Sequence, residues 1–386
     1  MKKELTKAVL AVVVGLFATA CTSDTPIEPV TPDSELVEML LNGGVSFAVS
    51  PDTKAALPTT RAVINKEHGS VALAFARVDA TASGTGTSAA YPAWSACTTY
   101  LNATLASNTG DATPAEKDIT FDTPQYYLTS GYYTKLVGWA PSVASDSEGN
   151  TFAGTASTFS AGTVACPIDG ETDIMLSQEL EGNKETATQF SATNPFVFGH
   201  LLTQIKVSAY AADEAGKTHW GQITGIKVKG EANKECRIVL PGTAASAVTY
   251  PLQSGKTAGD LSLIFKKASD DTAISTPLTL NYDGETGVTD YKQECGYAMF
   301  APIASVDGKA TVTVLVSTTG GPDGHAVSDY AVPVTVTTAD GFKAGTAYGI
   351  TLKFSAQGIN FSGTITEWED YDWTTGGGSF NGEITL

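Results

Sequence analysis

Two short sequences near the start of the chain contain residue types that can take part in covalent chemistry. The first is Cys21, which follows the small residues Ala18-Thr19-Ala20, a short apolar run and a basic beginning. A cysteine in this position is typical of a bacterial lipoprotein signal, in which the preceding segment is removed and the cysteine is acylated. The alternative is an ordinary signal peptide followed by a chance cysteine.

The second sequence is Arg61-Ala62, a peptide bond of the kind that an arginine-specific protease cuts. Arginine is scarce, and the other two, Arg77 and Arg237, lie inside strand-like runs. Arg61 stands in a polar stretch with prolines, which is typical of an exposed loop. We therefore expect a single cut, between Arg61 and Ala62. The alternative is an ordinary loop arginine.

No other constellation predicts chemistry. The histidines have no metal-ligand spacing with one another or with cysteine, and no nucleophile elbow, dinucleotide-binding or phosphate-loop motif occurs. Acidic residues are numerous, so paired carboxylates of an exported glycosidase stay as the last alternative. We predict no catalytic residue, metal or cofactor. The later cysteines of this exported chain are compatible with two disulfides or with buried thiols. They are Cys97, Cys166, Cys236 and Cys295.

The elements that would position Cys21 and Arg61 are β-strands. Glycine is abundant, with 38 residues, and the helical Glu/Lys/Leu periodicity is nearly absent, so the 386-residue chain is predicted to be all-β. A formal net charge of −18 argues against binding to nucleic acid or to anionic lipid. The length allows two ordinary domains.

Two strand patterns flank the main body of the chain. The stretch 43–50 alternates, with Val45, Phe47 and Val49 on one face. At the other end, 379–386 alternates behind a glycine-rich tether. Its apolar face comprises Phe380, Gly382, Ile384 and Leu386. A terminal strand is not stable alone, so it must pair with a sheet in its own molecule or in a neighbour. The sequence pattern leaves both possibilities open.

The remaining strands predict two β-sandwiches with a border near residue 194. In the first, Val71–Val78 reads as a buried strand. Alternating stretches at 119–127 and 132–139, separated by Thr129-Ser130-Gly131, predict a hairpin. The expected segments are a signal peptide (1–20), a lipidated propeptide (21–61), an N-terminal sandwich (62–194), a C-terminal sandwich (195–373) and a linker with the last strand (374–386).

Several short motifs in a fixed order resemble the fimbrillins, the donor-strand (type V) pilins of Bacteroidales. The motifs are Phe121-Asp-Thr-Pro-Gln-Tyr-Tyr127, Leu136-Val-Gly-Trp139, Asp173-Ile-Met-Leu176, Phe198-Gly-His-Leu-Leu-Thr-Gln-Ile-Lys-Val207, Gly225-Ile-Lys-Val228, Gly341-Phe-Lys-Ala-Gly-Thr-Ala-Tyr-Gly-Ile-Thr-Leu-Lys-Phe354 and Ile365-Thr-Glu-Trp368. They cover most of residues 121–368.

The resemblance implies two tandem transthyretin-like Greek-key sandwiches and a structural subunit of a cell-surface fimbrium that supports adhesion. It further implies an outer-membrane lipoprotein precursor that carries palmitate on Cys21. An arginine-specific protease would cut after Arg61 and release the strand of Val45, Phe47 and Val49. The C-terminal strand of another copy, or of a related pilin, would then fill the groove. The alternative from this resemblance is an uncut, lipid-anchored surface protein that binds glycans or host proteins. Stalk, tip and anchor roles stay open.

Overall fold

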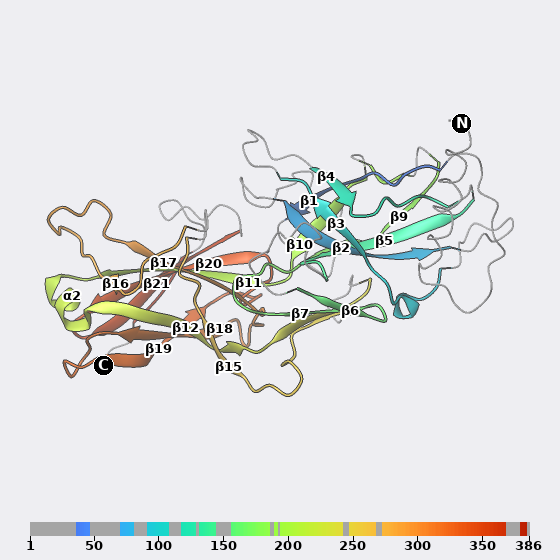
Figure 1. Cartoon of the computed structure of the whole chain (residues 1–386). Coiled ribbons are helices and arrows are strands. Elements are labelled where there is room, and N and C mark those ends of the chain that lie inside the picture. The colour runs from blue at the N-terminus through green and yellow to red at the C-terminus, as the bar shows by residue number, and fades with distance from the viewer. Residues whose placement is uncertain are drawn as a thin grey trace.

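The computed structural model describes residues 36–46, 70–80, 91–107, 117–128, 131–143, 156–185, 189–191, 194–241, 247–267, 272–367 and 379–383 (Figure 1). Within these ranges nearly all regular structure is strand, which confirms the all-β prediction. The described helices are the 3-10 turn η2 (Trp94–Ala96) and the short α2 (Glu214–Trp220). In Figure 1 the strands form two bodies that lie side by side.

The N-terminal body is built on a closed ring of strands, here called the N-terminal barrel. Its strands pair in the order β2-β3-β4-β1-β10-β8-β5, and β5 returns to pair with β2, while β9 pairs with β5 outside the ring. The bounds are β1 Leu41–Ser46, β2 Val71–Asp79, β3 Leu101–Leu105, β4 Lys117–Phe121, β5 Tyr133–Ala140, β8 Met175–Ser177, β9 Leu180–Asn183 and β10 Phe196–His200.

Apolar side chains fill the interior of this barrel because residues of one parity on each strand point inward. Phe75 of β2 lies among them, and its ring makes edge-to-face contacts with Phe121, Phe196 and Phe198 at centroid distances of 5.6, 5.1 and 6.2 Å. Such aromatic contacts stabilise a core beyond the burial of their area. Other members of the same core are Met39, Leu41, Leu73, Ala103, Leu105, Ile119 and Leu136.

A second sheet packs against the outside of the barrel. It runs β14-β13-β7-β6, with bounds β6 Thr158–Ser160, β7 Thr163–Pro167, β13 Glu235–Val239 and β14 Val248–Thr249. The alternate residues of β2, such as Ala74 and Ala76, share its core with Trp139. Both faces of β2 are therefore buried, as predicted from the apolar run. β10, β13 and β14 all follow the expected border at residue 194, yet they belong to the N-terminal body.

The C-terminal body consists of two sheets that enclose one large core. One sheet runs β17-β11-β20-β21-β22 and the other β15-β12-β18-β19, with β16 paired to β12. The bounds are β11 Thr203–Ala211, β12 Gln222–Ala232, β15 Gly259–Ser262, β16 Leu278–Thr279, β17 Gln293–Phe300, β18 Ala310–Thr318, β19 Val327–Val336, β20 Thr346–Ser355, β21 Gly358–Glu367 and β22 Ser379–Glu383.

β17 connects the cores of the two bodies. Ala298 and Phe300 point into the C-terminal core, whereas Tyr297 and Met299 pack into the core between the barrel and its outer sheet. A strand that contributes its two faces to two cores joins the bodies through packed side chains as well as through the chain.

The cysteines of the two bodies do not form two disulfides. Cys236 and Cys295 are buried free thiols, and Cys166 stands opposite Cys236 in the register of β7 and β13. Burial raises the pKa of Cys166 to about 12 and also raises the pKa values of Cys236 and Cys295. Cys236 and Cys295 thus agree with the expectation of small buried thiols, whereas Cys97 is disulfide-bonded.

Candidate functional site

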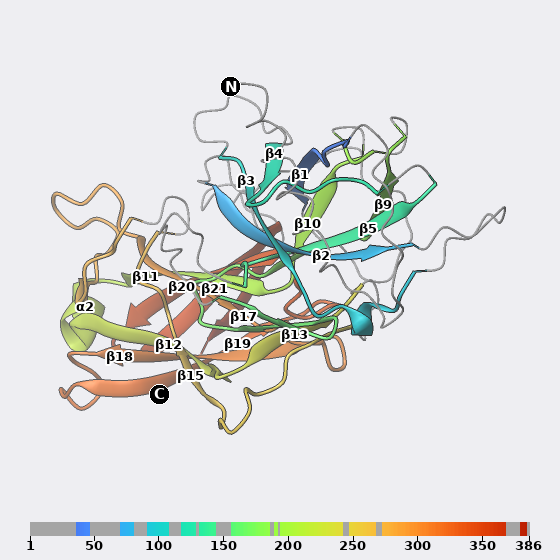
Figure 2. The ribbon, with the colours of Figure 1, turned by 45° about the vertical axis from the view of Figure 1, so that its right-hand side comes forward.

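β1 is held on both sides within the N-terminal barrel (Figure 2). It pairs antiparallel with β4, with Leu41 opposite Ile119, and parallel with β10, where Gly43 is opposite Phe196 and Val45 is opposite Phe198. On its other side β4 pairs with β3, and β10 pairs with β8. β1 therefore closes the ring between β4 and β10.

The side chains of β1 and of the residues just before it complete the barrel core. Met39 and Leu41 are 3% and 2% exposed, whereas Leu36 and Leu40, of the opposite parity, are 63% and 70% exposed. This alternation makes 36–41 a continuation of the same half-buried strand pattern. The backbone is fixed as well, because the N–H of Met39 donates to the carbonyl oxygen of Gln125 at 2.8 Å.

β1 approaches its neighbours closely at Gly43. A Cβ atom at this position would lie 2.5 Å from Cδ1 of Ile119 and 2.9 Å from the carbonyl oxygen of Phe196. The second contact is to backbone, which cannot rotate away as the end of a side chain can. Glycine is therefore required here by space, and the groove that β1 occupies is shallow at this position.

The chain order gives β1 a special connection to the rest of the barrel. β1 ends at Ser46 and β2 begins at Val71, so Arg61 lies between them in the sequence. A cut after Arg61 would break the backbone connection between β1 and the rest of the barrel. Arg61 and Ala62 themselves lie outside the described residues, as does Cys21.

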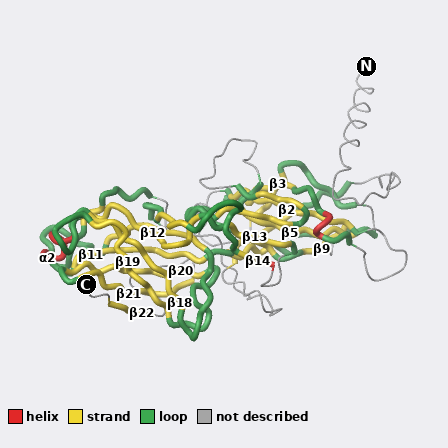
Figure 3. Tube along the Cα trace, turned by 90° about the horizontal axis from the view of Figure 1, so that it is seen from below, coloured by secondary structure: helices red, strands yellow, loops and turns green. Residues whose placement is uncertain are grey.

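The other end of the chain forms an edge strand. β22 pairs antiparallel with β21, with Gly382 opposite Phe361 and Asn381 opposite Ser362, and it is the last strand of its sheet (Figure 3). In this structure the tail therefore pairs with its own chain, on one side only. The description ends at Glu383, so Ile384 and Leu386 lie outside it.

The sequence located both strands but began the first one too late. Of its predicted inward residues, Val45 lies in β1, and Phe47 and Val49 lie outside the described residues. The structure adds Met39 and Leu41, which sequence reasoning missed, and it shows that Gly43 faces the core. The two adjacent glycines weaken an alternation pattern, because glycine has low strand propensity. The close approach at Gly43 explains their presence.

In the described ranges, residues with metal-binding or catalytic side chains do not form a second candidate site. No group of three or more His, Cys, Asp or Glu side chains in the described ranges is arranged to hold a metal ion. His200, at the end of β10, is buried, and its Nδ1 lies 2.6 Å from Oδ2 of Asp173. This pair fixes the end of β10 against the segment before β8, which is a structural role.

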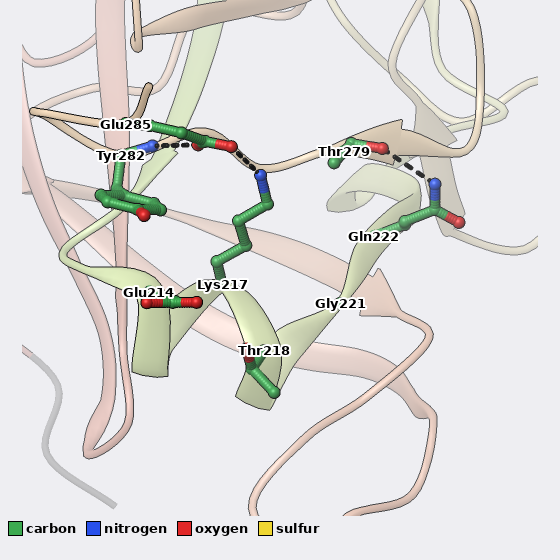
Figure 4. Close-up of a pocket in the computed structure, with 8 residues that line it drawn as sticks. All are labelled: Glu214, Lys217, Thr218, Gly221, Gln222, Thr279, Tyr282 and Glu285. Carbon is green, nitrogen blue, oxygen red and sulfur yellow. Dashed lines mark hydrogen bonds and ion pairs between the residues drawn. The ribbon is translucent and has the colours of Figure 1, made fainter. Parts of the chain in front are cut away.

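An open hollow of about 340 Å³ lies at the far end of the C-terminal body beside α2 (Figure 4). Two of its charged groups, and two of its polar groups, pair with each other. Lys217 pairs with Glu285 and lowers the pKa of that carboxyl group, and Nε2 of Gln222 donates to the hydroxyl of Thr279 at 2.9 Å. The hollow thus presents paired polar groups and no aromatic platform other than Tyr282.

In the described part of the chain, no helix is long and apolar enough to cross a membrane.

No family model matches the sequence, and no curated protein matches it. Several solved structures are similar over most of their length. A candidate cell adhesion protein from Bacteroides ovatus has 14% identity and a TM-score of 0.47, over 88% of this chain and 100% of that one. A fimbrial protein from Bacteroides vulgatus has 12% identity and a TM-score of 0.42, over 86% and 99%. A fimbrial assembly protein from Parabacteroides distasonis has 12% identity and a TM-score of 0.38, over 86% and 99%.

At these TM-scores the likeness locates no site, so the assignment of sites rests on the geometry of this chain.

Proposed function

We propose that the chain is a structural subunit of a cell-surface fimbrium that supports adhesion and assembles by strand exchange. It is exported as a lipoprotein acylated at Cys21 and reaches the outer membrane in that form. An arginine-specific protease cuts after Arg61, β1 leaves, and the C-terminal strand of a neighbouring subunit takes its place. We also propose that the two sandwiches have a transthyretin-like Greek-key topology.

The observation that carries the proposal is the position of β1. It is the only ring strand of the N-terminal barrel that a cut at Arg61 would separate from all the others, since every other ring strand follows residue 61. A single hydrolysed bond at that position would thus make an interior strand releasable. A cut between any two later strands would leave at least two barrel strands in the N-terminal fragment.

The loss of β1 would leave a binding site with two kinds of unsatisfied surface. The facing backbone groups of β4 and β10 would lose their partners, and the contacts of Met39 and Leu41 with the barrel core would be lost. Burial of each such side chain contributes roughly 1.5–3 kcal/mol, so an empty groove is unstable in water. Unpaired strand edges of this kind are templates for the addition of another strand.

The tail is a suitable donor because it pairs with fewer strands in its own molecule than it would in the β1 position of the barrel. On β21 it pairs along one edge, whereas in the barrel a strand pairs with β4 and with β10 at once. Transfer of the tail from the first position to the second adds a second row of backbone hydrogen bonds and buries an apolar face. Because donor and acceptor lie on different bodies of one subunit, the contact repeats without closing and produces a polymer.

The presence of a tail favours a stalk or stalk-like subunit over a tip subunit. An anchor subunit would stay uncut, so cleavage after Arg61 distinguishes a stalk subunit from an anchor subunit.

The first test is the N-terminus of subunits taken from surface multimers. We expect sequencing to begin at Ala62, and we expect Arg61→Ala to leave an uncut chain that does not polymerise. Arg237→Ala is the matched control, because Arg237 is half-exposed on β13 and its loss should change neither result. Multimers whose subunits still begin at Cys21 would contradict the cleavage step.

A separate test concerns the lipid. Cys21→Ala should abolish incorporation of labelled palmitate and surface delivery, while the two bodies keep their melting temperatures. Unchanged incorporation would mean that another residue carries the anchor.

A further inference from the structure

Two segments at opposite ends of the chain share one seven-residue pattern. Leu41-Asn-Gly-Gly-Val-Ser-Phe47 contains β1, and Phe380-Asn-Gly-Glu-Ile-Thr-Leu386 is the tail. Apolar residues stand at the first, fifth and seventh positions of both, and a hydroxyl residue at the sixth. The second and third positions are Asn-Gly in both. Alternation explains the apolar residues, but it does not explain the identical Asn-Gly pair.

The structure gives a physical reason for the identical glycine. Gly43 points into the barrel where the carbonyl oxygen of Phe196 leaves no room for a Cβ atom. Any strand that replaces β1 in this register needs glycine at that position. In the tail, the only glycine with an apolar residue two positions on either side is Gly382.

The structure also gives a reason for the identical asparagine. Nδ2 of Asn42 donates to Oδ1 of Asp118 on β4 at 2.7 Å, on the exposed side of the strand pair. A strand with asparagine one residue before the required glycine reproduces this bond. The interaction is exposed and weak, so it serves to select the register more than to stabilise the complex.

We propose, on the basis of the proposed strand exchange, that the partner which fills the β1 groove is the tail of a second copy of this same chain, seated residue for residue. Phe380 takes the position of Leu41, Asn381 that of Asn42 and Gly382 that of Gly43. In the neighbour, Asn381 then stands opposite Asp118, and Gly382 stands beside Phe196. A shift by one residue in either direction would place Asn381 or Glu383 where only glycine fits. The chain is thus self-complementary and forms a homopolymer.

The register is tested first without polymerisation, in the full precursor with Arg61→Ala. The tail sequence Phe380–Leu386 is grafted in place of Leu41–Phe47. We expect the melting temperature of the barrel to stay within about 3 °C of the parent. The matched control grafts Ser379–Thr385 into the same positions, which puts Asn381 at position 43, and it should lower the melting temperature by at least about 10 °C. Equal melting temperatures for the two grafts would overturn the proposed register.

The second experiment locates the tail in the polymer. Cells express a donor chain with Asn381→Cys together with an acceptor chain with Asp118→Cys, and surface multimers are oxidised and analysed by gel. We expect a disulfide-linked dimer of donor and acceptor, and at least ten times less of it when the acceptor carries Thr120→Cys. Multimers that cross-link through Thr120→Cys instead would overturn the register while strand exchange stands. If the tail cross-links to Ser362→Cys of its own chain in every multimer, strand exchange fails as well.

Discussion

β1 and β22 are both short strands near an end of the chain, and their environments differ in one decisive respect. β1 is paired on both sides and closes the N-terminal barrel, whereas β22 is paired on one side and ends a sheet. Removal of an interior strand opens a core to water. Removal of an edge strand exposes only a new edge, here that of β21. The comparison shows that one chain holds an interior strand near its N-terminus and an edge strand near its C-terminus.

The largest expected effect comes from placing a charge at equivalent positions of the two strands. In the uncut Arg61→Ala precursor, Leu41→Asp should lower the free energy of unfolding by at least about 3 kcal/mol, because it buries an unpaired carboxylate in the barrel. Phe380→Asp in the same precursor should lower it by less than about 1 kcal/mol. Urea unfolding of the two variants makes the measurement. Equal losses would mean that the two strands are equally integral to the monomer.

A second variant tests the shape of the groove at Gly43. Gly43→Ala should lower the free energy of unfolding of the uncut precursor by about 1–3 kcal/mol, because the new Cβ meets the backbone of Phe196. Gly225→Ala is the matched control on β12, where the nearest atom to a new Cβ is Cβ of Ser317 at 3.9 Å, an ordinary contact. It should change the value by less than about 0.5 kcal/mol. A Gly43 variant as stable as this control would remove the spatial argument for glycine.

The smallest expected effect concerns Tyr127, whose backbone bonds to Val37 just before β1. Tyr127 donates its backbone N–H to the carbonyl oxygen of Val37, and burial raises the pKa of its phenol to about 12. Because the folded state holds this proton more tightly than the unfolded state does, the stabilisation is complete below pH 10. It is lost as the pH rises toward 12.

We therefore expect Tyr127→Phe to flatten the decline in stability of the uncut precursor between pH 10 and about 12. Stability measured at each pH by urea unfolding gives the slope. An unchanged slope in Tyr127→Phe would show that this phenol does not couple the barrel to pH.

The strand content could be predicted from the sequence, but the pairing of the strands could not. Alternation and apolar runs identified Val71–Val78 and the two terminal strands, because each has a local pattern. The hairpin predicted between 119–127 and 132–139 is wrong. β4 pairs with β1 and β3, and β5 pairs with β2, β8 and β9. Ring closure depends on contacts between residues far apart in sequence, and no local pattern records them.

The candidate site, too, could be predicted from the sequence only in part. The sequence indicated which residues of β1 face inward, because Val45 has the same parity as the buried Leu41 and Gly43. The sequence did not predict the burial of Met39 and Leu41, because the glycines interrupt the alternation where space excludes a side chain. The repeat of Asn-Gly at the two ends of the chain was a signal available in the sequence alone. Its meaning depended on the contacts of Asn42 and Gly43.

The most direct measurement deletes Ser379–Leu386 and follows monomer stability and polymer content on the same deletion. Stability is measured in the uncut Arg61→Ala precursor, and polymer in the cleavable chain by gel electrophoresis of surface fractions in SDS without boiling. We predict a melting temperature within about 3 °C of the full-length precursor and no SDS-resistant multimers. A melting temperature lowered by about 10 °C or more would show that the tail is an integral strand of its own domain, and multimers that persist without the tail would show that it is not the donor. Either result would contradict strand exchange.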